Sequence, residues 1–104
     1  MNEDYPTDEE LDLIKNWPHE SGFISLMDKV HELWWAPDWG WHEEDAINDY
    51  EESIIRYNIS TGGWSGNEDL IFALKSNFFF WGMGWCSSRK GGHYVFELPI
   101  EVNK

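Results

Sequence analysis

Apolar residues recur at helical spacing in three segments of the first half of the chain. The first segment opens with a capping-box pattern at Thr7 and ends before Pro18. The second runs from Ser21, a residue type suited to cap a helix, to the stop at Pro37. Residues 42–52 combine a thin apolar edge with an acidic remainder. Together these patterns predict three helices in the first half.

β-Branched and aromatic residues dominate the second half and change the predicted elements. Residues 53–60 alternate in the manner of a strand. A helix follows a Gly-rich turn, with Ser65 or Asn67 as its cap. Residues 78–88 predict a long aromatic strand, which returns through a Gly-Gly hairpin turn as the strand 93–98.

The predicted elements fit one α+β domain over residues 1–104, in the order ααα-β-α-β-β. A sheet of about three mainly antiparallel strands would be backed by the helices. Residues 1–52 would form an acidic helical half, and residues 53–104 a sheet-forming half with one helix. A chain of 104 residues is long enough to bury one core.

The net charge is −13 and lies in the first half of the chain. Residues 1–52 carry 16 Asp and Glu against 2 Lys and Arg, whereas residues 53–104 carry 4 against 5. Such a surface disfavours direct binding to a nucleic-acid backbone or an anionic membrane, because both attract Lys and Arg. It favours a protein partner with a basic surface. An acidic surface that serves solubility is the alternative that the charge leaves open.

Tryptophan is abundant, and its distribution suggests a contact surface. Four of the eight Trp lie within residues 34–41, where Pro37 and Gly40 interrupt any regular element. These rings cannot share one face, so we expect a structured loop with at least one accessible ring. Because exposed Trp is favoured at protein contacts, the predicted partner site joins this loop to the acidic segment after it. Its residues are Trp39, Trp41, Glu43, Glu44, Asp45, Asp49, Glu51 and Glu52.

Two Gly-rich turns suggest a different, ligand-binding site. The turn T-G-G-W-S-G precedes a helix, whose N-terminus could hold an anion, and Trp64 could stack on a base. In the hairpin turn R-K-G-G, Arg89 could bind a phosphate. Plain structural turns are the alternative. The predicted ligand-binding residues are Trp64, Ser65, Asn67, Glu68, Arg89, His93 and Tyr94.

The sequence motifs predict neither a catalytic site nor a metal-binding site. The turn G-W-S-G lacks the spacing of the G-x-S-x-G nucleophile elbow. His31, His42 and His93 each have an acidic neighbour, but none has the spacing of H-E-x-x-H or of paired C-x-x-C. We therefore expect a protein that is not an enzyme and that needs no metal or cofactor.

The expected compartment is a cytoplasm. Cys86 is the only cysteine, so no intramolecular disulfide can form, and a reducing environment fits best. The first residues show neither the basic start nor the apolar stretch of a signal peptide. No apolar run approaches the roughly 20 residues that span a bilayer.

The two turns resemble those of a family of short, uncharacterised bacteriophage proteins. That family has a T-G-G-W-S-G-[NC]-E turn leading into a helix and an S-S-R-[RK]-G-G-H-Y hairpin, and the match covers Thr61–Glu68 and Ser87–Tyr94. The resemblance implies a phage origin and expression inside a bacterial host, and it transfers no function. The first hypothesis is therefore a phage protein that binds and inhibits a host protein with a basic or nucleic-acid-binding surface, for example in a defence system. A small-ligand or nucleotide-binding protein and a phage structural or assembly component are the alternatives.

Overall fold

The first helix begins at the predicted capping box. The structure, a computed structural model, describes residues 5–100. Thr7 Oγ1 accepts a hydrogen bond from the backbone N–H of Glu10 (3.1 Å), and the Glu10 carboxylate accepts one from the backbone N–H of Thr7 (2.8 Å). These bonds satisfy two backbone donors that a helix start leaves free. The predicted first helix is therefore confirmed as α1 (Asp8–Lys15).

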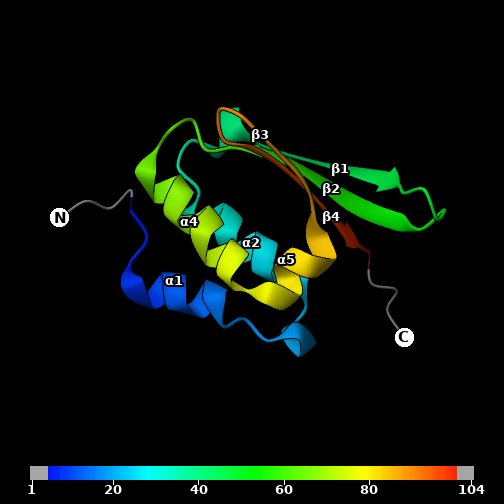
Figure 1. The fold of residues 1–104 in the computed structure, drawn as a ribbon, viewed down its shortest axis with the longest axis horizontal. Coiled ribbons are helices and arrows are strands. Elements are labelled where there is room, and N and C mark those ends of the chain that lie inside the picture. Colours follow the sequence, from blue (N-terminus) through cyan, green and yellow to red (C-terminus); the bar gives the residue numbers. More distant parts are fainter. Residues whose placement is uncertain (1–4, 101–104) are drawn as a thin grey trace.

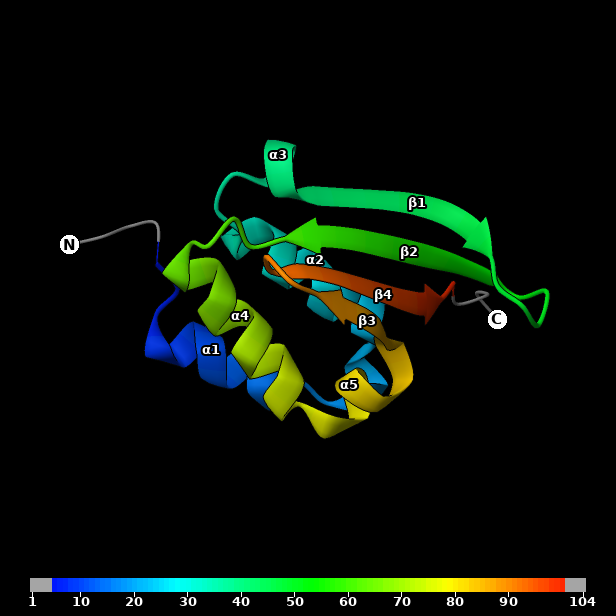
Figure 2. The ribbon, with the colours of Figure 1, turned by 45° about the horizontal axis from the view of Figure 1, so that its top comes forward.

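The helices and strands form two layers. Figures 1 and 2 show α1, α2, α4 and α5 on one side of the sheet, which leaves its other face without helices. The elements that follow α1 are η1 (His19–Ser21), α2 (Phe23–Leu33), α3 (Pro37–Gly40), β1 (Trp41–Ile47), β2 (Ser53–Ser60), α4 (Ser65–Ser76), α5 (Phe78–Gly84), β3 (Trp85–Arg89) and β4 (His93–Pro99).

The sheet has four antiparallel strands in the order β1-β2-β4-β3. The α+β class is confirmed, as are the strand at 53–60 and the hairpin that returns as β4. The predicted number of about three strands is wrong, because residues 42–52, predicted as a helix, supply most of a fourth strand. Residues 78–88 also differ from the prediction, because most of the predicted strand is a helix.

Residues 42–52 form most of β1 and a turn, not the predicted third helix. β1 pairs with β2 along its full length, from Trp41 opposite Ile59 to Ile47 opposite Ser53. The turn closes around Asn48, whose side-chain oxygen accepts the backbone N–H groups of residues 50 and 52 at 2.9 and 3.0 Å. A helix would have placed Asp45 and Asp49 one turn apart, where like charges repel. The strand avoids that repulsion and buries Trp41.

Residues 78–84 form helix α5, and only residues 85–88 of the predicted long strand belong to the sheet, as part of β3. The Asn77 side chain caps α5 by accepting the backbone N–H of Phe80 at 3.2 Å. The helix turns Phe80 into the core, against Phe23 and Phe96. Its last residue, Gly84, lies so close to Leu98 that a Cβ there would be 3.0 Å from a Leu98 methyl group.

The core lies between the helices and the covered face of the sheet. The interior side chains of β2 and β4 pack against those of the four helices. The tryptophan-rich segment 34–41 contains the short helix α3. As expected, its four rings do not share one face, and at least one of them is accessible. Trp35 and Trp39 are exposed, whereas Trp34 and Trp41 are buried and meet edge to face. Among the helices of residues 5–100, none has the length and apolar character needed to cross a bilayer.

Tyr57 makes the stability of the fold sensitive to alkali. Burial, and next the charges of Glu43 and Asp28, raise the pKa of its hydroxyl above the usual range. A tyrosine in the unfolded chain loses its proton near pH ~10, so the stability that Tyr57 contributes is complete below that pH and declines as the pH rises past it. We expect Tyr57→Phe to reduce the loss of stability between about pH 9 and 11. Urea unfolding across that range measures this loss, and Tyr50→Phe at an exposed position should leave it unchanged.

Candidate functional site

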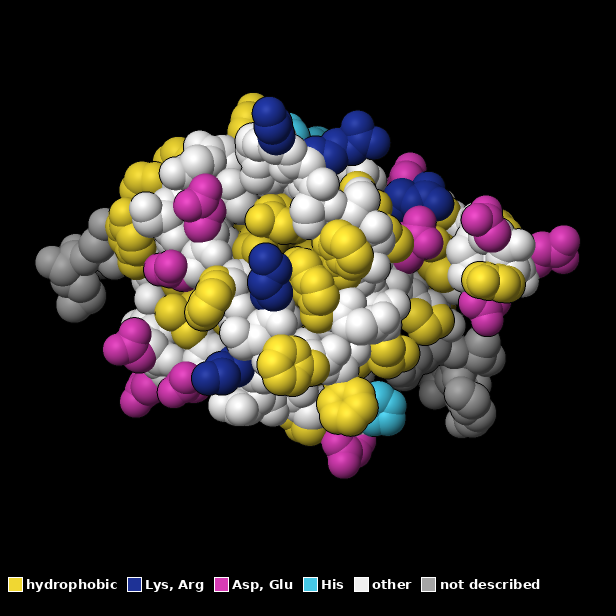
Figure 3. Space-filling model, viewed as in Figure 1, with side chains coloured by type: hydrophobic (Ala, Val, Ile, Leu, Met, Phe, Trp, Pro, Cys, Tyr) yellow, Lys and Arg dark blue, Asp and Glu magenta, His cyan; other side chains and the backbone are white. Residues whose placement is uncertain are grey.

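The most prominent surface feature is a projecting acidic hairpin, residues 41–60. β1, β2 and the turn between them extend past the helices and form one end of a molecule of 45 × 28 × 21 Å (Figures 1 and 2). Figure 3 shows Asp and Glu side chains gathered at that end. The hairpin contains all six acids of the predicted partner site: Glu43, Glu44, Asp45, Asp49, Glu51 and Glu52.

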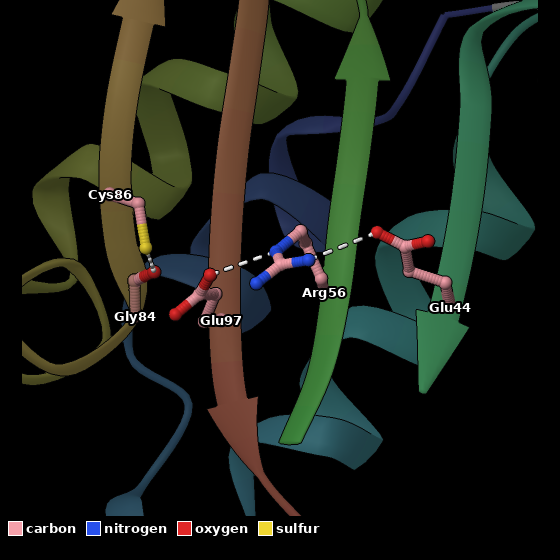
Figure 4. A network of polar contacts seen from close by, with 5 residues as sticks. All are labelled: Glu44, Arg56, Gly84, Cys86 and Glu97. Atoms are coloured by element: carbon pink, nitrogen blue, oxygen red, sulfur yellow. Dashed lines mark hydrogen bonds and ion pairs between the residues drawn. The ribbon is translucent and has the colours of Figure 1, made fainter. Parts of the chain in front are cut away.

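The only cation of the acidic hairpin is held by internal ion pairs. Arg56 donates to Glu97 at 2.9 Å and to Glu44 at 3.2 Å, which joins three neighbouring strands (Figure 4). The hydrogen bonds to Glu97 and then Glu44 raise the pKa of the Arg56 guanidinium. Asp45, Asp49 and Glu51 form no ion pair or side-chain hydrogen bond within residues 5–100. Their charges are therefore available to a partner.

Two apolar side chains lie among these acids at the tip of the acidic hairpin. Ile47 ends β1 and is 62% exposed, and Tyr50 lies in the turn and is 84% exposed. Exposed Tyr within a charged surface is common at protein contacts. The sequence pattern assigned both residues to the apolar side of a helix, so only the strand and its turn reveal them as surface residues.

The two tryptophans predicted for the partner site do not join the hairpin tip. Trp41 is buried between Trp34 and Tyr57, and its indole N–H donates to Glu43 at 2.8 Å. Its ring is therefore not a contact surface. Trp39 is exposed, but it precedes β1 and lies at the end of the strand away from the turn. With a rise of about 3.3 Å per residue, the strand separates these two ends by roughly 20 Å.

The two Gly-rich turns do meet in space. The backbone N–H of Thr61 donates to the carbonyl oxygen of Gly92 at 3.0 Å, and the Thr61 side chain packs on Gly92. Gly62, Gly91 and Gly92 have φ values of 65°, 86° and 81°, which side chains rarely adopt. The contact joins the start of α4 to the β3–β4 hairpin.

The side chains predicted to bind a ligand nevertheless point in different directions. Trp64 stacks on Trp35, with ring centroids 4.7 Å apart. Asn67 is buried and pairs with the backbone of Trp35, accepting its N–H at 2.8 Å and donating to its carbonyl at 3.1 Å. Tyr94 stacks on Phe96. Ser65 and Glu68 lie on the first turn of α4 and are exposed. None of these side chains shares a hydrogen bond with Arg89 or His93 within the described residues.

Arg89 and His93 instead lie on the helix-free face of the sheet. Cross-strand partners and alternate residues of a strand share a face. Arg89 is the cross-strand partner of His93, and His93 is the cross-strand partner of Ser60, so the three share a face. Ser60 is also on the same face as Arg56, four residues earlier in β2, and Figure 4 shows Arg56 on the side away from the helices. The Ser60 hydroxyl and His93 Nδ1 form a short hydrogen bond.

A hollow on this face collects residues from five elements. Its volume is about 520 Å³, and we refer to it as the open-face hollow. No Asp or Glu lines it within the part of the chain that the structure describes. The lining residues are Trp39 from α3, His42 from β1, Asn58, Ile59 and Ser60 from β2, Arg89 from β3, and His93, Tyr94 and Val95 from β4.

An aromatic surface over α4 and α5 is a second feature that the sequence pattern does not predict. Figure 3 shows apolar side chains over these helices, next to Lys or Arg side chains. Exposed apolar patches of this kind are common where proteins contact other molecules. The predicted strand would have placed every second one of its residues in the core, whereas the helix exposes most of them. The most exposed are Phe72, Phe78, Phe79 and Met83.

The described residues show no assembled catalytic or metal-binding group. Within residues 5–100, no three His, Cys, Asp or Glu side chains are placed to hold a metal ion together. Ser60 and His93 pair, but no carboxylate of the described chain bonds the other ring nitrogen of His93. The Cys86 thiol is exposed and donates to the Gly84 carbonyl at 3.7 Å (Figure 4); partial burial, and next the Glu97 charge, raise its pKa. A raised pKa disfavours the reactive thiolate.

Comparison with known proteins finds no matching family model, no matching curated protein and no matching solved structure. The chemistry of the surfaces is therefore inferred from their own residues.

Proposed function

We propose that this chain is a small phage protein that binds a basic surface of a host protein and blocks it, without catalysis. The acidic hairpin is the observation that carries this proposal. Its Asp45, Asp49 and Glu51 are exposed and have no ion pair within residues 5–100. The resemblance of the two Gly-rich turns to phage proteins supports action in the cytoplasm of a bacterial host.

The shape of the hairpin suits this role as well as its charge. Concentrated charge of one sign accelerates encounter with an oppositely charged partner, and it rejects partners of like charge. Ile47 and Tyr50 add apolar area at the tip, where charge alone would give a weak complex. A groove that normally holds nucleic acid has the required basic surface, so the preferred target is a nucleic-acid-binding host protein.

Reversing the charge of Asp45, Asp49 and Glu51 tests the proposal. The triple variant Asp45→Lys, Asp49→Lys, Glu51→Lys leaves the Arg56 ion pairs and the Trp41 contact intact. We expect it to lose the host protein captured by the wild type, with affinity reduced at least about tenfold. Capture from host lysate with identification by mass spectrometry, followed by titration of the purified partner, measures the loss. Wild-type capture should also weaken as salt is raised.

The control triple variant Asp12→Lys, Glu20→Lys, Asp69→Lys changes the net charge by the same amount at exposed positions away from the hairpin. It should retain the partner. Equal losses in the two triple variants would mean that overall charge, not the acidic hairpin, drives capture. Undiminished capture by the hairpin variant would refute the proposal. Incorporation of the protein into purified virions would favour the assembly role instead.

A further inference from the structure

We propose that the open-face hollow binds a small ligand made of a flat ring and a phosphate group, of the mononucleotide kind. This site uses the end of the acidic hairpin away from its turn, where His42, Asn58 and Ser60 lie, and the inference does not depend on the proposed protein partner. It also differs from the ligand site that the Gly-rich turns suggested, since it retains only Arg89, His93 and Tyr94 of those residues. The other residues of the hollow come from α3, β1, β2 and β4, and the sequence pattern did not connect them with ligand binding.

The anionic group is inferred from the charge at one end of the hollow. Arg89 is exposed and has no ion pair or side-chain hydrogen bond within residues 5–100. In a chain with a net charge of −13, a hollow that holds this cation and is lined by no described carboxylate is a distinct local environment. A guanidinium offers paired donors that match two oxygens of a phosphate.

His93 adds a second group beside Arg89, its cross-strand partner. The bond between Ser60 and His93 Nδ1 fixes the orientation of the imidazole and leaves Nε2 without a partner among the described residues. When the Ser60 hydroxyl donates to Nδ1, the proton of the neutral ring lies on Nε2, which can then donate to a phosphate oxygen. In that tautomer, Arg89 and His93 both present donors to the same anion.

The flat ring is inferred from Trp39 at the other end of the hollow. One part of its indole packs on Gly62, where a Cβ would lie 2.9 Å from the ring, and 62% of the residue is exposed. Because the indole contacts Gly62 and most of the residue is exposed, the ring offers a stacking surface for a base. His42 and Asn58 are opposite each other on β1 and β2 and line the same hollow, and their polar atoms can bind the edge of a ring.

The dimensions favour a single nucleotide over a nucleic-acid strand. β1 and β3 are separated by β2 and β4, and Arg89 lies two residues along β3 from the position level with His42. Three strand spacings of about 4.8 Å and this offset give roughly 16 Å between His42 and Arg89. This distance accommodates one base with its phosphate. A longer strand would need further cations along its path, and the adjoining part of this face carries Glu44 and Glu97 around Arg56.

Titration with AMP, adenosine and inorganic phosphate tests the site, by calorimetry and by amide chemical shifts. The wild type should bind AMP more tightly than either fragment, with the largest shifts at residues of the open-face hollow. Arg89→Gln should weaken AMP binding about tenfold or more, toward the level of adenosine. Trp39→Ala should weaken AMP and adenosine and leave phosphate binding unchanged.

Lys90→Gln is the matched control, because Lys90 is the neighbouring cation in the same turn but does not line the hollow. It should bind AMP like the wild type, and thermal unfolding should show that all three variants remain folded. Equal weakening by Arg89→Gln and Lys90→Gln would overturn the proposal in favour of diffuse charge attraction. Absence of AMP binding to the wild type at millimolar concentration, or shifts confined to the helical side, would also overturn it.

Discussion

Replacing Asn77 with alanine is expected to lower the free energy of unfolding by about 3 kcal/mol. Asn77 is buried, and all of its side-chain polar atoms are used. Its Nδ2 group donates to the carbonyl oxygens of Ile14 (3.0 Å) and Trp17 (3.2 Å), and its Oδ1 accepts the N–H of Phe80. Alanine would remove the cap of α5 and leave buried backbone groups of α1, its C-terminal loop and α5 without partners.

Urea unfolding followed by circular dichroism measures this loss. Asn16→Ala is the control, because Asn16 makes a single exposed bond to Asp12 in the same region and should cost about 0.5 kcal/mol or less. Asn77→Asp keeps the capping oxygen but places a carboxylate against two carbonyl oxygens, so it should be at least as unstable as Asn77→Ala at neutral pH. A stability of Asn77→Ala close to that of the wild type would show that the three bonds contribute little.

Replacing Gly92 with alanine is expected to cost about 3 kcal/mol, because two penalties combine there. Gly92 has a φ of 81°, and a Cβ at this position would lie 2.2 Å from Thr61 Oγ1. Gly91 has a similar φ of 86° but only His93 near its Cβ position, at 3.9 Å. Gly91→Ala should therefore show the backbone penalty alone, about 1 kcal/mol.

A double-mutant cycle with Thr61→Ala separates the two penalties. Thr61→Ala removes the oxygen that would collide and leaves its Cβ at an acceptable 3.4 Å. In that background Gly92→Ala should cost only about as much as Gly91→Ala, which corresponds to a coupling of about 2 kcal/mol. Denaturant unfolding of the four proteins provides the test. The same cost of Gly92→Ala in both backgrounds would show that the contact between the two turns does not limit this position.

Local patterns account for the parts of the fold that the sequence predicts. The capping box at Thr7 forms from bonds between residues three apart, and the β-branched run 53–60 forms the predicted β2. The Gly-Gly hairpin turn needs positive φ values that glycine adopts readily. The order of residue types along the chain also predicts an exposed ring in the segment 34–41, which Trp39 provides, and the acidic character of residues 42–52.

The candidate sites could be predicted only in part. Arg89 and His93 are recognisable as polar residues beside a turn, and the acids are recognisable as a cluster. The shape that presents those acids is a hairpin, however, and the helical pattern of the same residues obscured it. His42, Asn58 and Ser60 carry no local signal of a ligand site, since only the pairing of β1, β2 and β4 brings them to the same face of the sheet as His93.

Tertiary contacts decided the two segments whose local pattern was misleading. Residues 42–47 became a strand because pairing with β2 and burial of Trp41 outweighed a weak, mutually repelling acidic helix. Residues 78–84 became a helix because Asn77 bonds to carbonyl groups about sixty positions earlier in the chain and holds Phe80 in the core. The sequence by itself determined the acidic character of the hairpin segment and the elements with local signals, such as the capped helix α1, the strand β2 and the Gly-Gly hairpin turn. The tertiary structure decided which face of the molecule each side chain occupies, because that choice depends on contacts between distant segments.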